Sequence, residues 1–205
     1  MKANNLMIID ICQDLIALDV VATAESISTA ETVPYISVKT TRFGSINVET
    51  DLVIEFTTGL IGFEKYKRFV VIRPDAQSAF RWLQSLDEPS LAFPVLEPRM
   101  FRPTYAPTIS DADARALGLQ TDTPVIVFSV VTVPSGSPRD MTANLMGPLV
   151  VNCITRVARQ VIIQDDGYHT RHRVMDEMLQ VLTGSSDPPA VTTVKYGKAT
   201  NRAAA

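Results

Sequence analysis

A succession of short apolar runs constrains what this chain can fold into more than any other feature. The runs are rich in valine, isoleucine and phenylalanine, and clusters of glycine, proline and aspartate separate them. This pattern is typical of small barrels and sandwiches. We therefore predict a mainly β fold: a small antiparallel, barrel-like domain with one or two short helices. The predicted strands span residues 36–41, 46–48, 52–56, 69–72, 80–85, 92–96, 125–133, 141–145, 149–154 and 157–163.

The longest of these runs, residues 125–133, is apolar on both faces. Such a strand lies centrally, with the core on one side and another element on the other. The best candidate for that element is a short helix that begins after Ser110 and ends at Gly118. Asp111 and Asp113 point away from each other at i and i+2, so charge at a helix start explains them better than a catalytic carboxylate pair.

The length of 205 residues and a hydrophobic content of 46% suit one globular domain with a sizeable core. We place this β-rich domain at residues 36–174. Residues 1–35 are predicted to be an N-terminal extension, and residues 175–205 a short helix followed by a disordered tail. Residues 1–35 and the residues after about Thr183 offer no clear share of the core, so deleting either segment is predicted to leave the domain folded.

Charge, hydropathy and cysteine content indicate which kinds of partner and which location to expect for this chain. The net charge is −3 and the densest basic run is Arg171-His172-Arg173, so direct nucleic-acid binding is not expected. The apolar stretch 6–22 contains three aspartates, which argues against a membrane span and a signal peptide. Cys12 and Cys153 are too few for a disulfide framework, so we expect a reducing, cytoplasmic location.

No residue pattern for catalysis or cofactor binding is found in the sequence. His169 and His172 lack a third ligand nearby and are flanked by arginines, which disfavours a metal ion. Cys153 lies in an apolar strand, where burial is expected to raise the pKa of its thiol. Gly59 and Gly62 lack the spacing and the lysine of a phosphate loop, so a tight turn explains them better. We predict no catalytic residue, no metal and no cofactor.

Several polar side chains interrupt the strand pattern. Trp82 and Gln84 share one face of their strand. If Trp82 is buried, Gln84 is buried with it and needs partners; if Trp82 is exposed, it is an aromatic anchor for an interface. Asn144 and Asn152 flank Pro148, and they either satisfy backbone groups left unpaired beside the proline or recognise a partner.

Three residues that follow the glycine turn, Phe63, Glu64 and Tyr66, are the best candidates for an exposed binding surface. Loops that are mounted on a rigid sheet concentrate binding residues.

Four ordered segments of the chain resemble the flagellar assembly factor W (FliW) family of bacteria. They are Gly59-Leu60-Ile61-Gly62-Phe63-Glu64 with residues 68–72, then residues 80–89, then residues 141–148, and finally residues 159–162 with 168–172. The resemblance covers residues 36–174. It implies a compact, non-enzymatic protein that binds the carbon storage regulator, a small dimeric RNA-binding repressor, and keeps it from blocking translation of flagellin messenger RNA. Newly made flagellin would displace the regulator from this protein.

The resemblance also implies which positions matter. The family-like positions are Gly59, Gly62, Phe63, Glu64, Phe69, Trp82, Leu83, Gln84, Ser85, Met141, Asn144, Pro148, Asn152, Gln160 and Arg171. Partner contact is predicted for Phe63, Glu64, Tyr66, Trp82, Gln84, Ser85, Asn144 and Asn152. Two other functions remain open. One is a flagellin export chaperone without a translational role, and the other is an enzyme built on a flavin-type split barrel, which needs a phosphate-binding cluster such as residues 171–173.

Overall fold

The computed structural model describes residues 7–13, 34–75, 78–184 and 194–195. Most of the regular secondary structure consists of short strands. The strands are β1 Met7–Ile8, β2 Tyr35–Thr40, β3 Gly44–Glu49, β4 Ile54–Phe56, β5 Arg68–Arg73, β6 Arg81–Ser85, β7 Ala92–Leu96, β8 Val125–Thr132, β9 Thr142–Ala143, β10 Leu149–Asn152, β11 Val157–Gln160 and β12 His172–Arg173. The helices are α2 Asp111–Ala116, α3 Val174–Thr183 and the 3-10 turns at Thr50–Leu52, Pro98–Met100 and Pro138–Asp140.

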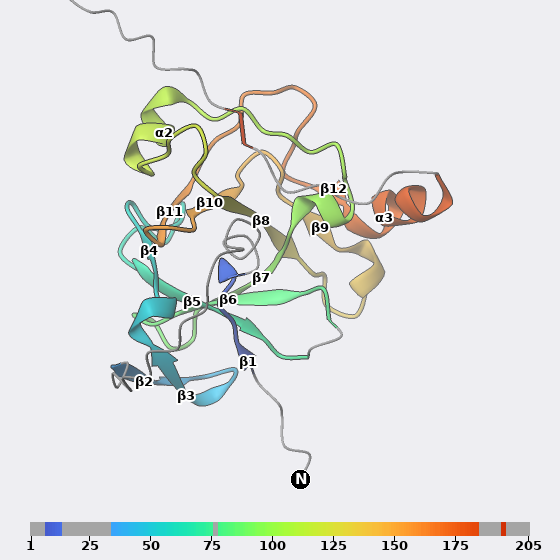
Figure 1. Ribbon diagram of the computed structural model, residues 1–205. Coiled ribbons are helices and arrows are strands. Elements are labelled where there is room, and N and C mark those ends of the chain that lie inside the picture. The colour runs from blue at the N-terminus through green and yellow to red at the C-terminus, as the bar shows by residue number, and fades with distance from the viewer. Residues whose placement is uncertain (1–6, 14–33, 76–77, 185–193, 196–205) are drawn as a thin grey trace, which may run out of the picture.

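The centre of the molecule is a closed barrel of seven strands (Figure 1). The strands follow the order β10, β11, β4, β5, β6, β7 and β8, and β8 pairs with β10 to close the ring. All of these pairings are antiparallel except β11 with β4, which is parallel. A ring with an odd number of strands cannot be antiparallel at every contact, so one parallel pair is a geometric requirement. The predicted mainly β, barrel-like fold is confirmed.

Strand β8 occupies the central position that its apolar sequence predicts. Its first half pairs with β10, and its second half pairs with β7 and then β9. Ile126 and Phe128 point into the barrel, while Val125 and Val127 pack outside it against Ala114 and other residues of the α2 region. The two-sided apolar run is therefore buried on both faces, as expected.

Helix α2 begins as its sequence predicts. The Ser110 Oγ accepts a hydrogen bond from the Asp113 backbone N–H at 3.1 Å, and Gly118 follows the helix with φ +64°. Asp113 also forms an ion pair with Arg159 on β11, with an N–O distance of 2.6 Å. This ion pair ties the helix to the barrel.

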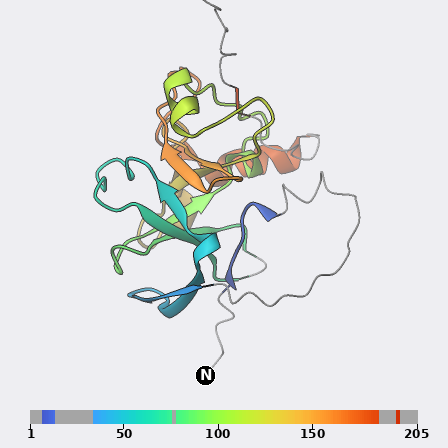
Figure 2. The same cartoon turned by 60° about the vertical axis from the view of Figure 1, so that its left-hand side comes forward.

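Three apolar clusters make up the core. One fills the barrel, one lies between the barrel and the segments that carry α2 and α3, and one lies under the β2–β3 hairpin. The hairpin and α2 lie at opposite ends of the barrel in both views (Figures 1 and 2). No helix in the described ranges is long and apolar enough to cross a bilayer.

The N-terminal residues contribute to the core, contrary to the expectation from sequence. β1 pairs with β5, Ile11 and Cys12 are buried in the barrel cluster, and Asp10 forms an ion pair with Arg156 at 2.7 Å. The aspartates in the apolar stretch 6–22 hide this contribution in the sequence, because the arginine that pairs with Asp10 lies 146 residues further along the chain. Residues 14–33 of the predicted extension lie outside the described residues.

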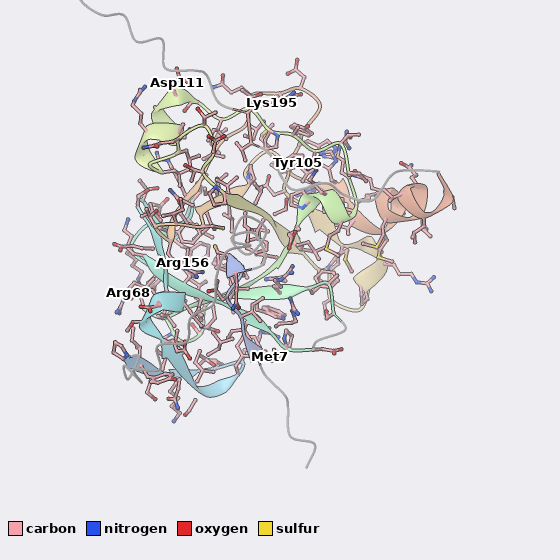
Figure 3. All side chains as sticks on the ribbon, viewed as in Figure 1. Met7, Arg68, Tyr105, Asp111, Arg156 and Lys195 are labelled. Atoms are coloured by element: carbon pink, nitrogen blue, oxygen red, sulfur yellow. The ribbon has the colours of Figure 1, made fainter. Side chains whose placement is uncertain are left out.

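The C-terminal region also contributes to the core. Met175 and Met178 of α3 pack against the apolar cluster beside the barrel. Val194 is buried, and Lys195 pairs with Thr108, close to the start of α2 (Figure 3). The Lys195 carbonyl accepts a hydrogen bond from the Ile109 N–H at 3.0 Å. The expectation that the C-terminal residues have no share in the core is therefore wrong for Val194. The tail predicted to be disordered otherwise falls at residues 185–193 and 196–205, outside the described residues.

Candidate partner-binding groove

The glycine turn at residues 59–64 pushes two apolar side chains outward. Gly59 and Gly62 have φ values of +72° and +84°, a region that glycine enters without strain. Leu60 is buried and anchors the turn, whereas Ile61 is 60% exposed and Phe63 is 37% exposed. The tight turn predicted from the glycines is confirmed, and its tip carries exposed apolar surface.

Glu64 holds the shape of the turn. Its carboxylate accepts a hydrogen bond from the Gly62 N–H at 2.7 Å, and this bond lowers the pKa of the carboxyl group below its usual value. Glu64 is exposed, so the turn carries a negative charge together with its exposed apolar side chains.

A groove of about 510 Å³ opens beside this turn. Phe63 forms one wall and packs edge-on against Phe93 of β7, with ring centroids 5.2 Å apart. The lining residues are Leu60, Ile61, Phe63, Phe93, Val130, Thr132, Pro134, Asp140, Thr142, Asn144, Gln160, Thr170 and Arg171. The groove thus combines an apolar wall with polar and charged groups on the other sides.

Two side-chain amides connect the walls of the groove. The Gln160 Oε1 accepts a hydrogen bond from the Ile61 N–H at 2.9 Å, and its Nε2 donates to the Gly147 carbonyl at 3.1 Å. The Asn144 Oδ1 accepts a hydrogen bond from the Gly147 N–H at 2.9 Å. Gln160 therefore fixes the glycine turn relative to the segment after β9, and the groove is formed before any partner arrives.

The structure brings together only some of the residues predicted to contact a partner. Phe63 and Asn144 line the groove, and Glu64 is exposed beside it. Tyr66 is half-buried, and its hydroxyl bonds to Glu88 at 3.2 Å. Partner contact stays a prediction for these residues; of the three that follow the turn glycine, Phe63 and Glu64 are exposed and Tyr66 is half-buried.

Trp82 lies away from the groove. It is half-buried in the cluster under the β2–β3 hairpin, where the Arg42 guanidinium stacks at 4.0 Å from its ring centroid and Phe43 packs edge-on. The ring is therefore neither a fully buried core residue nor an open anchor.

Gln84 and Ser85 are fully buried and hold a turn together. The Gln84 Nε2 donates to the carbonyls of Ser85 and Leu91 at 2.8 and 3.0 Å. The Ser85 Oγ accepts hydrogen bonds from the N–H groups of Asp87 and Glu88. Because both side chains bond to the backbone of their own turn, they shape the β6–β7 connection and do not reach the surface.

Asn152 also lies in the interior, with 1% of its surface exposed. Its Nδ2 donates to the Leu117 carbonyl at 2.9 Å, and its Oδ1 accepts from the Ile154 and Thr155 N–H groups. The side chain thus joins the end of α2 to the turn between β10 and β11.

Replacing Asn152 with alanine is expected to lower the free energy of unfolding by about 1–3 kcal/mol, because buried backbone groups lose their partners. A urea denaturation series measures this loss. At temperatures where the variant is folded, its affinity for a protein partner should equal that of the unchanged chain. Weaker binding by a fully folded Asn152→Ala variant would instead assign the residue a direct role in recognition.

Of the groove-lining residues, only Phe63 and Asn144 were predicted from the sequence to contact a partner. Ile61 lies between two turn glycines, as Leu60 does, and no local signal indicates which of the two is exposed and which is buried. Phe93 carries no signal either, because an aromatic residue in a strand usually belongs to the core. Gln160 and Arg171 were recognised as family-like positions but not as partner contacts.

The histidines are engaged within the fold. His172 is buried, its Nδ1 lies 2.8 Å from a Glu177 carboxylate oxygen, and its Nε2 accepts a hydrogen bond from the His169 N–H at 3.0 Å. Burial lowers the pKa of His172, against the opposing effect of Glu177. Within the ranges that the structure describes, no group of three or more histidine, cysteine, aspartate or glutamate side chains is placed to hold a metal ion.

Comparison with known proteins gives one consistent family. The family model described as FliW protein matches residues 37–174. The flagellar assembly factor FliW of Leptospira biflexa is 36% identical over 143 residues, which cover 70% of this chain and 94% of that protein. The corresponding factor of Bdellovibrio bacteriovorus is 40% identical over 143 residues, 70% of this chain and 81% of that protein. A crystal structure of the flagellar assembly factor FliW is similar with a TM-score of 0.62 and 30% identity, over 67% of this chain and 96% of the other.

Proposed function

This chain belongs to the FliW family of flagellar assembly factors, and we propose that it acts in the cytoplasm as a protein-binding regulator without catalytic activity. In this proposal it sequesters the carbon storage regulator, an RNA-binding translational repressor. Flagellin displaces that regulator, so flagellin that has not been exported limits its own synthesis. The carbon storage regulator and flagellin are its two proposed partners.

The observation that carries the proposal is the groove with its exposed apolar rim. Ile61 and Phe63 are large side chains held in the open by a glycine turn that Gln160 and Glu64 brace. Exposed aromatic residues on a rigid frame are typical anchors of protein interfaces. An interface of standard size buries about 800 Å² on each partner, so a specific complex would extend from the groove over the surface around it.

Two of the three basic residues in the run 171–173, which a flavin enzyme would need for phosphate binding, pair with acidic side chains of the protein itself. His172 is buried against Glu177, and Arg173 forms ion pairs with Asp140 and Asp176. Of the run 171–173, only Arg171 lines the groove. A protein-binding role agrees better with these contacts than a flavin enzyme does.

The remaining alternative is a flagellin export chaperone without a translational role. It differs from the proposal in one partner only. Isothermal titration of the purified chain with a carbon storage regulator, followed by addition of flagellin, separates the two functions. Binding of both proteins with mutual displacement supports the proposal. Binding of flagellin alone supports the chaperone, and binding of neither contradicts both.

Phe63→Ala is expected to weaken binding of the partner at least about tenfold, the effect of losing one aromatic anchor. Ile154→Ala is the matched control: Ile154 is 67% exposed and apolar but lies outside the groove lining. Both variants should be melted first to show that they are folded. Equal affinities for the two variants and the unchanged chain would place the interface away from this groove.

A further inference from the structure

The two cysteines of the chain, Cys12 and Cys153, lie next to each other inside the barrel. They are its only cysteines, both are free, and they belong to the same buried cluster with 0% and 2% of their surfaces exposed. The two thiol groups interact with each other, and each changes the pKa of the other. The chain thus brings together two sulfur atoms that come from its N-terminal segment and from the end of β10.

Neighbouring contacts hold the two thiols in place. One Asp10 carboxylate oxygen accepts hydrogen bonds from the Cys12 N–H at 2.9 Å and from the Arg156 guanidinium at 2.7 Å. The Cys153 N–H donates to the Pro124 carbonyl at 2.9 Å. Arg156, labelled in Figure 3, therefore connects the segment of one cysteine to the turn after the other.

The surroundings distinguish the two thiols chemically. The neighbouring Cys153 thiol and the positive charge of Arg156 lower the pKa of Cys12, against the effect of burial. The Cys12 thiol, together with burial, raises the pKa of Cys153. Because Asp10 holds the Arg156 guanidinium next to the Cys12 segment, Cys12 is the thiol assigned to react first and Cys153 the thiol that reacts second.

We propose that Cys12 and Cys153 form a reversible intramolecular disulfide when the protein meets a hydroperoxide, and that this bond fastens the N-terminal segment to the barrel. The proposal is independent of the proposed function. The FliW family model begins at residue 37, so Cys12 lies outside the part of the chain that the family shares.

The reaction proceeds in two balanced steps. The Cys12 thiolate attacks one oxygen of the hydroperoxide, the O–O bond breaks, an alcohol or water leaves, and Cys12 becomes a sulfenic acid. The Cys153 sulfur then attacks the Cys12 sulfur, the S–O bond breaks, and the released hydroxide leaves as water with the Cys153 proton. Two thiols lose two electrons and two protons, and the peroxide receives them. A small thiol reductant reverses the bond by exchange.

The disulfide is expected to stabilise the folded protein, because it closes a loop in the unfolded chain. It links residue 12 to residue 153 and so closes a long loop of the unfolded chain, which is the situation in which a crosslink restricts that chain most. The oxidised protein should therefore melt at a higher temperature than the reduced protein. Because both thiols are buried, the reaction should be slower than that of an exposed thiol.

The test treats the reduced full chain with hydrogen peroxide under native conditions, followed by alkylation and peptide mapping without reductant. We expect loss of both free thiols, a mass decrease of about 2 Da for the two hydrogens removed, and one linked pair of peptides containing Cys12 and Cys153. Added dithiothreitol should restore both thiols. Retention of both thiols in the folded protein, oxidation of either one beyond sulfenic acid without a link, or links only between molecules would overturn the proposal.

A Cys153→Ala variant provides the matched control. Peroxide should raise the melting temperature of the unchanged chain and leave that of the variant unaltered, while a sulfenic-acid reagent labels Cys12 in the variant. An equal rise in both proteins would contradict the proposal. If this variant does not fold, Cys12→Ala replaces it for the melting comparison, and the peptide map of the unchanged chain still decides the outcome.

Discussion

Deleting residues 1–13 is expected to lower the free energy of unfolding by about 3–6 kcal/mol, because a buried isoleucine contributes about 1.5–3 kcal/mol and the cavity it leaves adds to the loss. Ile11 and Cys12 both belong to the barrel cluster, and β1 pairs with β5. The deletion also leaves Arg156 without its Asp10 partner. Urea denaturation monitored by circular dichroism measures the difference.

A shorter deletion and a point variant make this test specific. Removal of residues 1–6 leaves β1, Ile11 and Cys12 in place, so its midpoint should stay close to that of the full chain. Ile11→Ala should account for a large part of the loss caused by the longer deletion. If the chain without residues 1–13 unfolds at the same urea concentration as the full chain, the N-terminal contacts contribute nothing to stability.

The strands could be predicted from sequence because the information is local. Apolar runs bounded by glycine, proline and aspartate mark β2 to β11, and the boundaries differ by only a few residues from those observed. The strands β1 and β12 are two residues each, too short to show any alternation. The capping serine of α2 could likewise be predicted, since its hydrogen bond reaches only three residues along the chain.

Contacts between distant parts of the chain could not be predicted. Whether Asn152 faces a partner or the backbone depends on the Leu117 carbonyl, 35 residues away, which no local pattern places beside it. The groove has the same origin, because the bond from Ile61 to Gln160 spans 99 residues. The resemblance to a family indicated which positions matter. Only the fold distinguishes the residues that hold the backbone in place from those that are exposed to a partner.

Gly59→Ala is expected to lower the free energy of unfolding by about 2–5 kcal/mol, combining about 1–2 kcal/mol for the left-handed backbone with about 1–3 kcal/mol for displaced neighbours. A Cβ atom at this position would lie 2.7 Å from the Cα and carbonyl oxygen of Glu64, and neither backbone atom can rotate away. The turn must therefore shift, and Ile61 and Phe63 shift with it.

Gly62→Ala separates backbone strain from the clash. Gly62 has a φ of +84°, but a Cβ there meets nothing within 4 Å, so this variant should lose only the backbone cost of about 1–2 kcal/mol. Chemical denaturation of both variants gives the difference. Binding of the protein partner, measured where both are folded, should be weakened strongly by Gly59→Ala and only slightly by Gly62→Ala, because only the first moves the wall of the groove. Equal stabilities for the two variants would show that the turn yields without strain, and the groove would then not depend on the approach of Gly59 to Glu64.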